Sequence, residues 1–362
     1  MKRCLEICSI ASEFPGSFVK NMQALIERAE NSDIALEFVF PPQAQEYLWC
    51  KQLSQKAKVH FVEASKAALN PKTYVQLGKI LRNGNFDIVH CHYESYDIPI
   101  KVLKSFYRLQ FRLLCHLHCN PVACLEIYSP LKQIYYKIMY KYFTAGNELI
   151  AINKNDADVI AKFAKKATVH TILNGIDFSD LKPKQPAIFP CTFMMHGWEF
   201  YRKGVDLVIE ACKILNEKGY TFKTVINGNE NTKRLIDEYL NGAWCDFLEF
   251  QEPQYNRNDF FDLSPVFLMA SRSETFNYGI AEAAYLGKHI ITSDIPGVSW
   301  SFCLPNVHTF KSESVEELAN LMEEYLLKSN EWQFDRKEVS NHIVDHYSDS
   351  VWSKSLIELY NN

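Results

Sequence analysis

At 362 residues the chain exceeds an ordinary single domain, and its 47% hydrophobic and 23% charged residues suit packed cores rather than disorder. Lysine and arginine (39 residues) are balanced by aspartate and glutamate (43 residues), and the net charge of −4 excludes the basic footprint of a nucleic-acid-binding domain. No stretch of 18 apolar residues occurs, which excludes a membrane-spanning helix of ordinary length.

The N-terminus and the cysteines indicate a cytoplasmic protein. The opening MKRCLEICSIASEF has a basic start, but Glu6 interrupts a short apolar run, so a first strand is expected rather than a signal peptide. The 11 cysteines are scattered without a CxxC pair, which is typical of reduced thiols that pack as small apolar side chains.

The first half alternates strand-like and helical patterns. Residues 18–28 place Phe18, Met22 and Leu25 on one face of a predicted helix. Strands separated by helices favour parallel βαβ units. Short apolar runs typical of strands occur at 4–10, 35–40, 87–91, 112–117 and 148–152.

The second half repeats this alternation after a loop at 180–190 that is rich in proline and lysine, as interdomain linkers are. Strands are predicted at 192–196, 223–227, 265–270 and 288–293. We therefore predict an α/β protein of two doubly wound domains with a cleft between them, in which ligands bind at the carboxyl ends of the strands. The predicted domains are 1–180 and 181–340, followed by a helix at 341–362 that returns to the first domain.

The stretch SRSETFNYGIAEAAYLG at 271–287 carries two carboxylates at a helix start. Seven residues separate Glu274, on a loop after a predicted strand, from Glu282, near the first turn of a predicted helix. Helical side chains lean toward the N-terminus, so both carboxylates can face one spot, where the helix dipole favours a phosphate. Carboxylates beside an anion site can accept hydrogen bonds from sugar hydroxyls. The alternative is a pair of surface glutamates flanking an ordinary helix start.

This stretch resembles the E-x7-E signature of the retaining glycosyltransferases of GT-B fold, the large family 4 type. The resemblance covers nearly the whole chain, including a glycine-rich loop, a strand that ends in an active-site histidine, and a phosphate-binding segment. The similar stretches are Pro15 to Ser17, 86–92 (FDIVHCH), 114–120 (LCHLHCN), 172–183 (ILNGIDFSDLKP) and 197–211 (GWEFYRKGVDLVIEA).

The resemblance implies two Rossmann-like domains that move a hexose from a nucleotide diphosphate sugar, foremost a UDP-sugar, with retention of anomeric configuration and without a divalent metal. It places His118 beside the donor sugar and Lys203 on the diphosphate. Glu274 would bind sugar hydroxyls, and Glu282 the ribose hydroxyls. The remaining donor contacts are assigned to residues of two loops: Gly16, Ser17, Asn277, Tyr278 and Gly279.

Three positions depart from the family pattern. Trp198 stands where the family has an arginine, and Arg202 or Arg272 is the candidate that replaces its charge. Ser17 and Asn277 stand where many members have glycine, although Asn277 tolerates the left-handed conformation. The alternative interpretation of Arg202 and Lys203 is a pair of solvated loop charges.

The spacing of the histidines and cysteines disfavours a zinc site. Closed zinc sites favour ligand pairs spaced by two to four residues, and the resemblance places the two histidine-bearing stretches on separate buried strands. Core or active-site histidines are therefore expected, and no metal ligand is predicted. The residues concerned are His90, His92, His116 and His118, with Cys91, Cys115 and Cys119.

Residues 101–143 carry seven lysines and arginines against one acidic residue, Glu126, in a chain that is acidic overall. The segment PLKQIYYKIMYKYF mixes lysines with aromatic residues on a predicted helix, which suits an anionic membrane surface. The alternative is a solvated basic face with its aromatic residues in the core.

We therefore expect a cytoplasmic, peripheral-membrane, retaining glycosyltransferase. Its expected acceptor is a growing surface glycan, such as a lipid-linked oligosaccharide for capsule, O-antigen or exopolysaccharide. The alternative is a non-catalytic GT-B protein that binds a glycan or supports a true transferase, which the departures at Trp198, Ser17 and Asn277 motivate. A nicotinamide dehydrogenase is disfavoured because SIASEFPGS, after the first strand, lacks the G-x-G-x-x-G loop.

Overall fold

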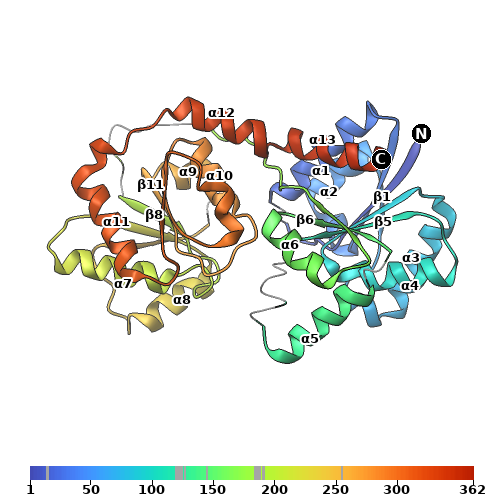
Figure 1. Ribbon diagram of the computed structural model, residues 1–362, viewed down its shortest axis with the longest axis horizontal. Helices are drawn as coiled ribbons and strands as arrows, with labels where there is room; N and C mark the ends of the chain where they lie inside the picture. Colours follow the sequence, from blue (N-terminus) through green and yellow to red (C-terminus); the bar gives the residue numbers. More distant parts are fainter. Residues whose placement is uncertain are drawn as a thin grey trace. The chain divides into compact units, whose positions relative to one another are not determined.

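The structure is a computed structural model that describes residues 1–13, 16–118, 125, 128–143, 146–182, 189, 192–253 and 256–362. It divides into two compact units, Met1–Asp177 with Tyr347–Asn362, and Phe178–His346 (Figure 1). The contacts thus divide the chain after 177 and again after 346, where the sequence placed boundaries after 180 and 340. Pro15, Cys119 and most of the predicted linker lie outside the described residues.

The first unit is built on a seven-stranded parallel sheet in the order β3-β2-β1-β4-β5-β6-β7. Its strands are β1 (Lys2–Cys8), β2 (Ile34–Phe40), β3 (Lys58–Phe61), β4 (Ile88–His92), β5 (Arg112–Leu117), β6 (Glu148–Ala151) and β7 (Thr168–Thr171). The helices are α1 (Ser17–Glu30), α2 (Leu48–Lys56), α3 (Pro71–Gly84), α4 (Asp97–Phe106), α5 (Pro130–Ile138), α6 (Lys154–Phe163) and α13 (Asp349–Asn361). The strand order reverses between β1 and β4, so the carboxyl ends of these strands form the ligand-binding edge of a doubly wound sheet.

Helices cover both faces of this sheet. One face packs residues such as Cys4, Ile88 and Leu114 against α1, α2 and α13, and the other packs Leu5, Val89 and similar residues against α3, α4 and α6. Alternate residues of a strand point to opposite faces, so strands buried on both sides need continuous apolar runs. The central strands have such runs, apart from Glu6 and the histidines of β4 and β5.

The C-terminal helix α13 belongs to the first unit and packs against α1. Trp352, Leu356 and Tyr360 are buried in the same core cluster as the apolar face of α1. A parallel bridge between Ile176 and Ser348 joins the two segments by which the chain leaves and re-enters this unit. The last 14 residues therefore complete the N-terminal core.

The second unit has a six-stranded parallel sheet in the order β10-β9-β8-β11-β12-β13. Its strands are β8 (Phe193–His196), β9 (Thr224–Asn227), β10 (Leu248–Gln251), β11 (Val266–Met269), β12 (His289–Ser293) and β13 (Val307–Phe310). The helices are α7 (Val205–Glu217), α8 (Glu230–Tyr239), α9 (Arg257–Phe261), α10 (Tyr278–Tyr285), α11 (Val315–Lys328) and α12 (Arg336–Tyr347). Here the order reverses between β8 and β11, which places the loops after these strands at the ligand-binding edge.

The prediction of two doubly wound α/β domains is confirmed. The strands that sequence reasoning missed are the sheet edges β3, β7, β10 and β13, each four residues long and partly exposed. Edge strands are less buried than central strands, so they need fewer apolar residues. Over four residues the apolar pattern is too short to identify a strand from the sequence.

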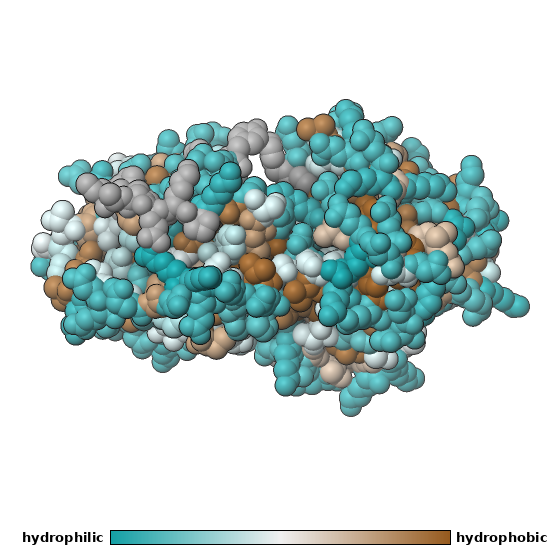
Figure 2. All heavy atoms as spheres, turned by 90° about the horizontal axis from the view of Figure 1, so that it is seen from above, coloured by the Kyte–Doolittle hydropathy of each residue, from teal (hydrophilic) through white to brown (hydrophobic). Residues whose placement is uncertain are grey.

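Figure 2 shows a face dominated by hydrophilic side chains, with apolar ones scattered among them. No helix of the described residues is long and apolar enough to cross a membrane. The eight cysteines that the structure describes are free thiols, and six of these are buried.

We predict that Leu356→Ala destabilises the first unit by about 2–5 kcal/mol, because it opens a cavity between α13 and the sheet. Leu356 is fully buried. Leu48→Ala is the matched control, since Leu48 is 72% exposed and should change stability by about 0.5 kcal/mol or less. Urea unfolding of both variants measures the difference, and equal midpoints would contradict the role assigned to α13.

Candidate functional site

In the first unit, polar side chains gather at the carboxyl ends of the three central strands. The register pairs Glu6 of β1 with His90 of β4, and His92 of β4 with His116 of β5. Because side chains alternate along a strand, these residues share one face, and His118 follows on the same face just beyond β5. Glu6, His90, His92 and His116 are almost fully buried, whereas His118 is partly exposed.

A chain of hydrogen bonds joins the buried carboxylate to His118. Glu6 Oε2 lies 2.9 Å from His92 Nε2, and His92 Nδ1 lies 3.1 Å from His118 Nε2. The Tyr360 hydroxyl of α13 donates to Glu6 Oε1 at 2.6 Å, and His90 Nδ1 lies 3.1 Å from Glu6 Oε2. The residue that the sequence assigned to the donor sugar is thus held in place through His92 by a carboxylate of the first strand.

Charge in this cluster is concentrated on Glu6. Burial opposes ionisation of Glu6, but the facing His90 and His92 outweigh it and hold its carboxyl pKa well below its usual range. Burial, with a smaller contribution from His90, lowers the pKa of His92 to about 4. Burial and the neighbouring histidines also lower the pKa of His116 and His118. At neutral pH Glu6 is therefore ionised, whereas His92, His116 and His118 are neutral.

The start of α1 lies beside His118. The Phe18 ring makes edge contacts with His118 and His92, at centroid distances of 5.7 and 5.0 Å. Gly16 precedes the helix with a φ of +64°, a conformation that favours glycine, and Ser17 begins α1. The structure therefore brings Gly16, Ser17 and His118 to one edge of the first sheet.

In the second unit, two cations converge on Glu274. Lys203 Nζ lies 2.5 Å from Glu274 Oε1, and Arg202 Nη1 lies 3.4 Å from the same oxygen. The Ser271 hydroxyl donates to this carboxylate at 2.8 Å, and the Glu274 side chain is only 8% exposed. Arg202 also donates to the Ser273 carbonyl at 3.0 Å, so the loop after β8 is tied to the loop after β11.

Two glycines allow the backbone to approach closely here. Gly204 has a φ of +69°, and a Cβ at this position would lie 2.0 Å from the Ala270 carbonyl oxygen. A Cβ on Gly297 would lie 1.8 Å from the carbonyl oxygen of Glu274. Only glycine fits at either position. The loop bearing Lys203 therefore packs closely against the end of β11, and the loop bearing Glu274 packs closely against the segment of Gly297.

The second carboxylate of the motif lies one helical turn into α10. Asn277 caps this helix, since its side chain accepts a hydrogen bond from the Ile280 N–H at 3.1 Å and its φ is +62°. Tyr278 and Gly279 form the first turn, and Glu282 is 7% exposed. Glu282 pairs with Arg257 Nη1 at 2.6 Å. The positive end of the α10 dipole thus lies beside the Glu274 loop.

The sequence missed several partners of the predicted residues. Arg257 pairs with Glu282, and Glu199 forms a 2.5 Å ion pair with Arg202. Neither pair belongs to a sequence motif that would have identified it as part of a binding site. Arg272, which the sequence offered as a donor contact, instead forms ion pairs with Asp206 at 2.7 Å and Glu313 at 2.7 Å. Its donor contact stays a prediction.

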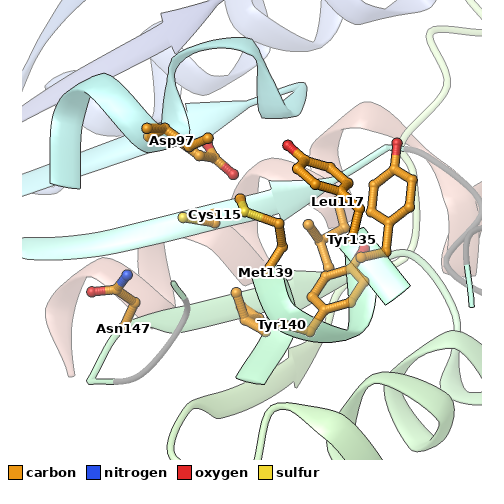
Figure 3. Close-up of a pocket in the computed structure, with 10 residues that line it drawn as sticks. Asp97, Cys115, Leu117, Tyr135, Met139, Tyr140 and Asn147 are labelled. Carbon is orange, nitrogen blue, oxygen red and sulfur yellow. The ribbon is translucent and has the colours of Figure 1, made fainter. Parts of the chain in front are cut away.

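A separate apolar cavity lies on the opposite face of the first sheet, between the sheet and α5. Figure 3 shows tyrosines and Met139 from the α5 region facing Cys115 and Leu117 of β5. Its volume of about 60 Å³ is room for a few water molecules and too small for a sugar. The cavity therefore belongs to the packing of α5.

These features define an α/β protein of GT-B fold with two groups of candidate binding residues, one in each unit. Residues 190–339 match the family model described as "Glycosyl transferases group 1", and residues 39–180 match that of "Glycosyltransferase Family 4". The first match covers 150 and the second 142 of the 362 residues, so each unit is similar to one of these glycosyltransferase families.

Known relatives are distant. The chain is 26% identical over 229 residues to the O-antigen biosynthesis glycosyltransferase WclY of Escherichia coli, a match that covers 58% of this chain and 62% of that protein. It is 23% identical to a Campylobacter jejuni N,N'-diacetylbacillosaminyl-diphospho-undecaprenol alpha-1,3-N-acetylgalactosaminyltransferase, over 72% of this chain and 73% of that one. The crystal structure of Anabaena HepE with UDP and glucose superposes with a TM-score of 0.76 at 12% identity, covering 100% of both chains.

His196, at the end of β8, provides a pH-dependent test of the second unit. Burial, assisted by Lys203, lowers the pKa of His196 to about 4. The folded protein therefore disfavours the protonated ring, and stability present above pH ~6.5 is lost as the pH falls toward ~4. We predict that His196→Phe, which removes the titration, reduces by about 1–2 kcal/mol the stability lost between pH 7.5 and 5.0.

Urea unfolding at the two pH values measures this effect. His346→Gln, which changes an exposed histidine of α12, serves as the control and should keep the wild-type dependence. An unchanged pH dependence in His196→Phe would show that this ring is not held neutral.

Proposed function

We propose that the chain is a retaining glycosyltransferase that moves a hexose from a nucleotide diphosphate sugar to a hydroxyl group of a growing surface glycan. The observation that carries the proposal is the convergence of Lys203 and Arg202 on Glu274, in a unit that is similar to the group 1 glycosyltransferases. Two cations beside a helix N-terminus suit a diphosphate, and a buried carboxylate beside them suits sugar hydroxyls.

The chemistry follows from where charge develops. As the bond between the sugar and the diphosphate breaks, negative charge builds on the leaving phosphate and positive charge on the sugar ring. Lys203 and Arg202 would stabilise the former, since preorganised cations lower the barrier most where charge appears. Arg202 would take the part of the arginine that is replaced by Trp198. Glu274 pairs with Lys203 and Arg202, and Glu199 pairs with Arg202, so a bound donor would share these cations with the two carboxylates.

The remaining roles follow the family resemblance. Glu274 and the first turn of α10 would hold the donor sugar, and Glu282 the ribose hydroxyls. His118 would lie beside the sugar, with its ring orientation set by the hydrogen bond to His92. We propose front-side attack, in which the leaving phosphate takes the acceptor proton and the anomeric configuration is retained. The cations at the diphosphate would make a divalent metal there unnecessary.

The substrates are inferred from the relatives. A HepE structure holds UDP and glucose, which supports a UDP-hexose donor. One relative is named for O-antigen biosynthesis and another for an undecaprenol-diphosphate-linked acceptor, which supports a lipid-linked oligosaccharide.

We predict that one nucleotide of the panel UDP, GDP, dTDP, ADP and CMP, foremost UDP, raises the melting temperature of the wild-type chain. A ligand at 100 times its Kd stabilises the native state by about 2.7 kcal/mol. Lys203→Met should weaken that binding by about tenfold or more, because a charge-assisted contact to the diphosphate is lost.

The matched control is Lys213→Met on α7, which removes a half-exposed lysine paired with Glu210 and should bind the nucleotide as the wild type does. Equal weakening in both lysine variants would contradict the diphosphate contact. No response to any nucleotide would contradict the transferase and favour the non-catalytic GT-B protein.

We further propose that α5 brings the protein to a membrane surface, where a lipid-linked acceptor resides. No residue of this helix is buried. Leu131 is 82% exposed and Ile134 54%, and Ile138 is exposed as well, interleaved with Lys132 and Lys137. Exposed apolar side chains among lysines suit the interface of an anionic bilayer. Arg112, in another part of the basic segment, forms an ion pair with Glu148 and so has less charge to offer a membrane. The proposal therefore rests on α5.

The prediction is that the chain co-sediments with anionic vesicles and less with neutral ones. Leu131→Asp combined with Ile134→Asp should weaken this binding by about tenfold or more, since each buried apolar side chain contributes about 1.5–3 kcal/mol. Leu48→Asp, on the exposed surface of α2, is the control. Vesicle binding that the double variant leaves intact would refute the role of α5.

A further inference from the structure

Three buried histidine nitrogens in the first unit have no hydrogen-bond partner. They are His90 Nε2 and both ring nitrogens of His116. His90 is 0% exposed and His116 1%. Buried polar atoms without a partner are rare and destabilising, and in native proteins they commonly mark a bound water or ion. Two of them lie on a ring of β5 and one on a ring of the neighbouring strand β4.

The hydrogen bonds of Glu6 decide which nitrogens carry lone pairs. The Tyr360 hydroxyl donates to Glu6 Oε1, so its oxygen accepts from His90 Nδ1 at 2.5 Å, and His92 Nε2 donates to Glu6 Oε2 at 2.9 Å. His90 Nε2 and His92 Nδ1 are then lone-pair donors, and His116 offers one of its two unpartnered nitrogens. Histidine ligands of metals characteristically donate their other N–H to a carboxylate, which fixes the tautomer and raises ligand basicity.

The same three residues are close enough together to share an ion. One ring nitrogen from each of His90, His92 and His116 lies within 4.8 Å of those of the other two. Ligands of a tetrahedral zinc lie about 3.3 Å apart, so the ring nitrogens need to approach one another by at most about 1.5 Å. His118 Nε2, already 3.1 Å from His92 Nδ1, lies at the partly exposed opening of the cluster.

We propose that His90, His92 and His116 bind one divalent transition-metal ion of the zinc type, with Glu6 as the carboxylate that orients two of the ligands. Imidazole nitrogens suit Zn²⁺, and the negative charge of Glu6 offsets part of the charge of the ion. The ion takes the His92 lone pair that His118 contacts, so in the ion-bound protein this hydrogen bond no longer sets the orientation of the His118 ring. The site does not rest on the proposed transferase activity.

The inference revises the expectation from the sequence, which disfavoured zinc. Rules based on sequence spacing detect only those metal-ligand pairs that lie a few residues apart in the chain. The sheet places β4 beside β5, and the register sets His92 against His116 across the strands. A pair of this kind is invisible to spacing rules because its two halves are 24 positions apart.

The test uses the full chain, stripped with a chelator and then dialysed against Zn²⁺, with elemental analysis of the bound metal. Co²⁺ is a second probe, because its visible absorption reports tetrahedral nitrogen ligation. We expect one ion per wild-type chain and a higher melting temperature with Zn²⁺. His116→Leu should bind at least about tenfold more weakly, and Glu6→Gln about 10–100-fold more weakly.

Two controls separate this site from other histidines. His289→Leu removes a buried histidine of the second unit, and the pair His342→Ala with His346→Ala removes stacked histidines of α12. Both should keep the ion. The proposal is overturned if the stripped wild type takes up no more zinc than His116→Leu, which would leave water as the occupant, or if the ion is lost with the α12 pair instead.

Discussion

The buried Glu6 carboxylate is the constraint around which the first unit is organised. An ionised carboxylate without exposure would be strongly destabilising unless several donors satisfied it. The donors come from distant parts of the chain, two histidines from β4 and the Tyr360 hydroxyl from the last turn of α13. The C-terminal helix therefore supplies a hydrogen bond as well as apolar area, and this is a physical reason for the chain to return to the first unit.

The second unit also contains a buried carboxylate, Glu274, but here its partners are positively charged side chains. Here two cations and one carboxylate are brought together by loops that only glycine allows to pack so closely. Removing Glu274 would take away the carboxylate that the largely buried Lys203 contacts, which is more damaging than the loss of an exposed ion pair. The ion pairs thus fix the geometry of these loops, and they hold two cations at the place where we propose that a diphosphate binds.

The sequence was sufficient for the architecture and for part of the site. Continuous apolar runs identified the central strands, and the spacing of Glu274 and Glu282 identified a helix start that the structure confirms at α10. The partners of those residues were not predictable. Arg257 reaches Glu282 from 25 positions away, and Tyr360 reaches Glu6 from the other end of the chain. Such pairs depend on the packing of whole elements, which leaves no local periodicity.

Trp198 stands where the family pattern has an arginine, and the position of Arg202 shows whether another cation can take the place of that arginine. Trp198 is exposed, so the indole is not there to fill a core. Arg202, four residues later, turns back to the Ser273 carbonyl and to Glu274, and Lys203 meets the same carboxylate oxygen. What a diphosphate requires is positive charge at a fixed place, rather than charge from a particular position in the chain. The loop that holds Arg202 and Lys203 on Glu274 therefore meets the requirement of the diphosphate contact that we propose, although Trp198 carries no charge.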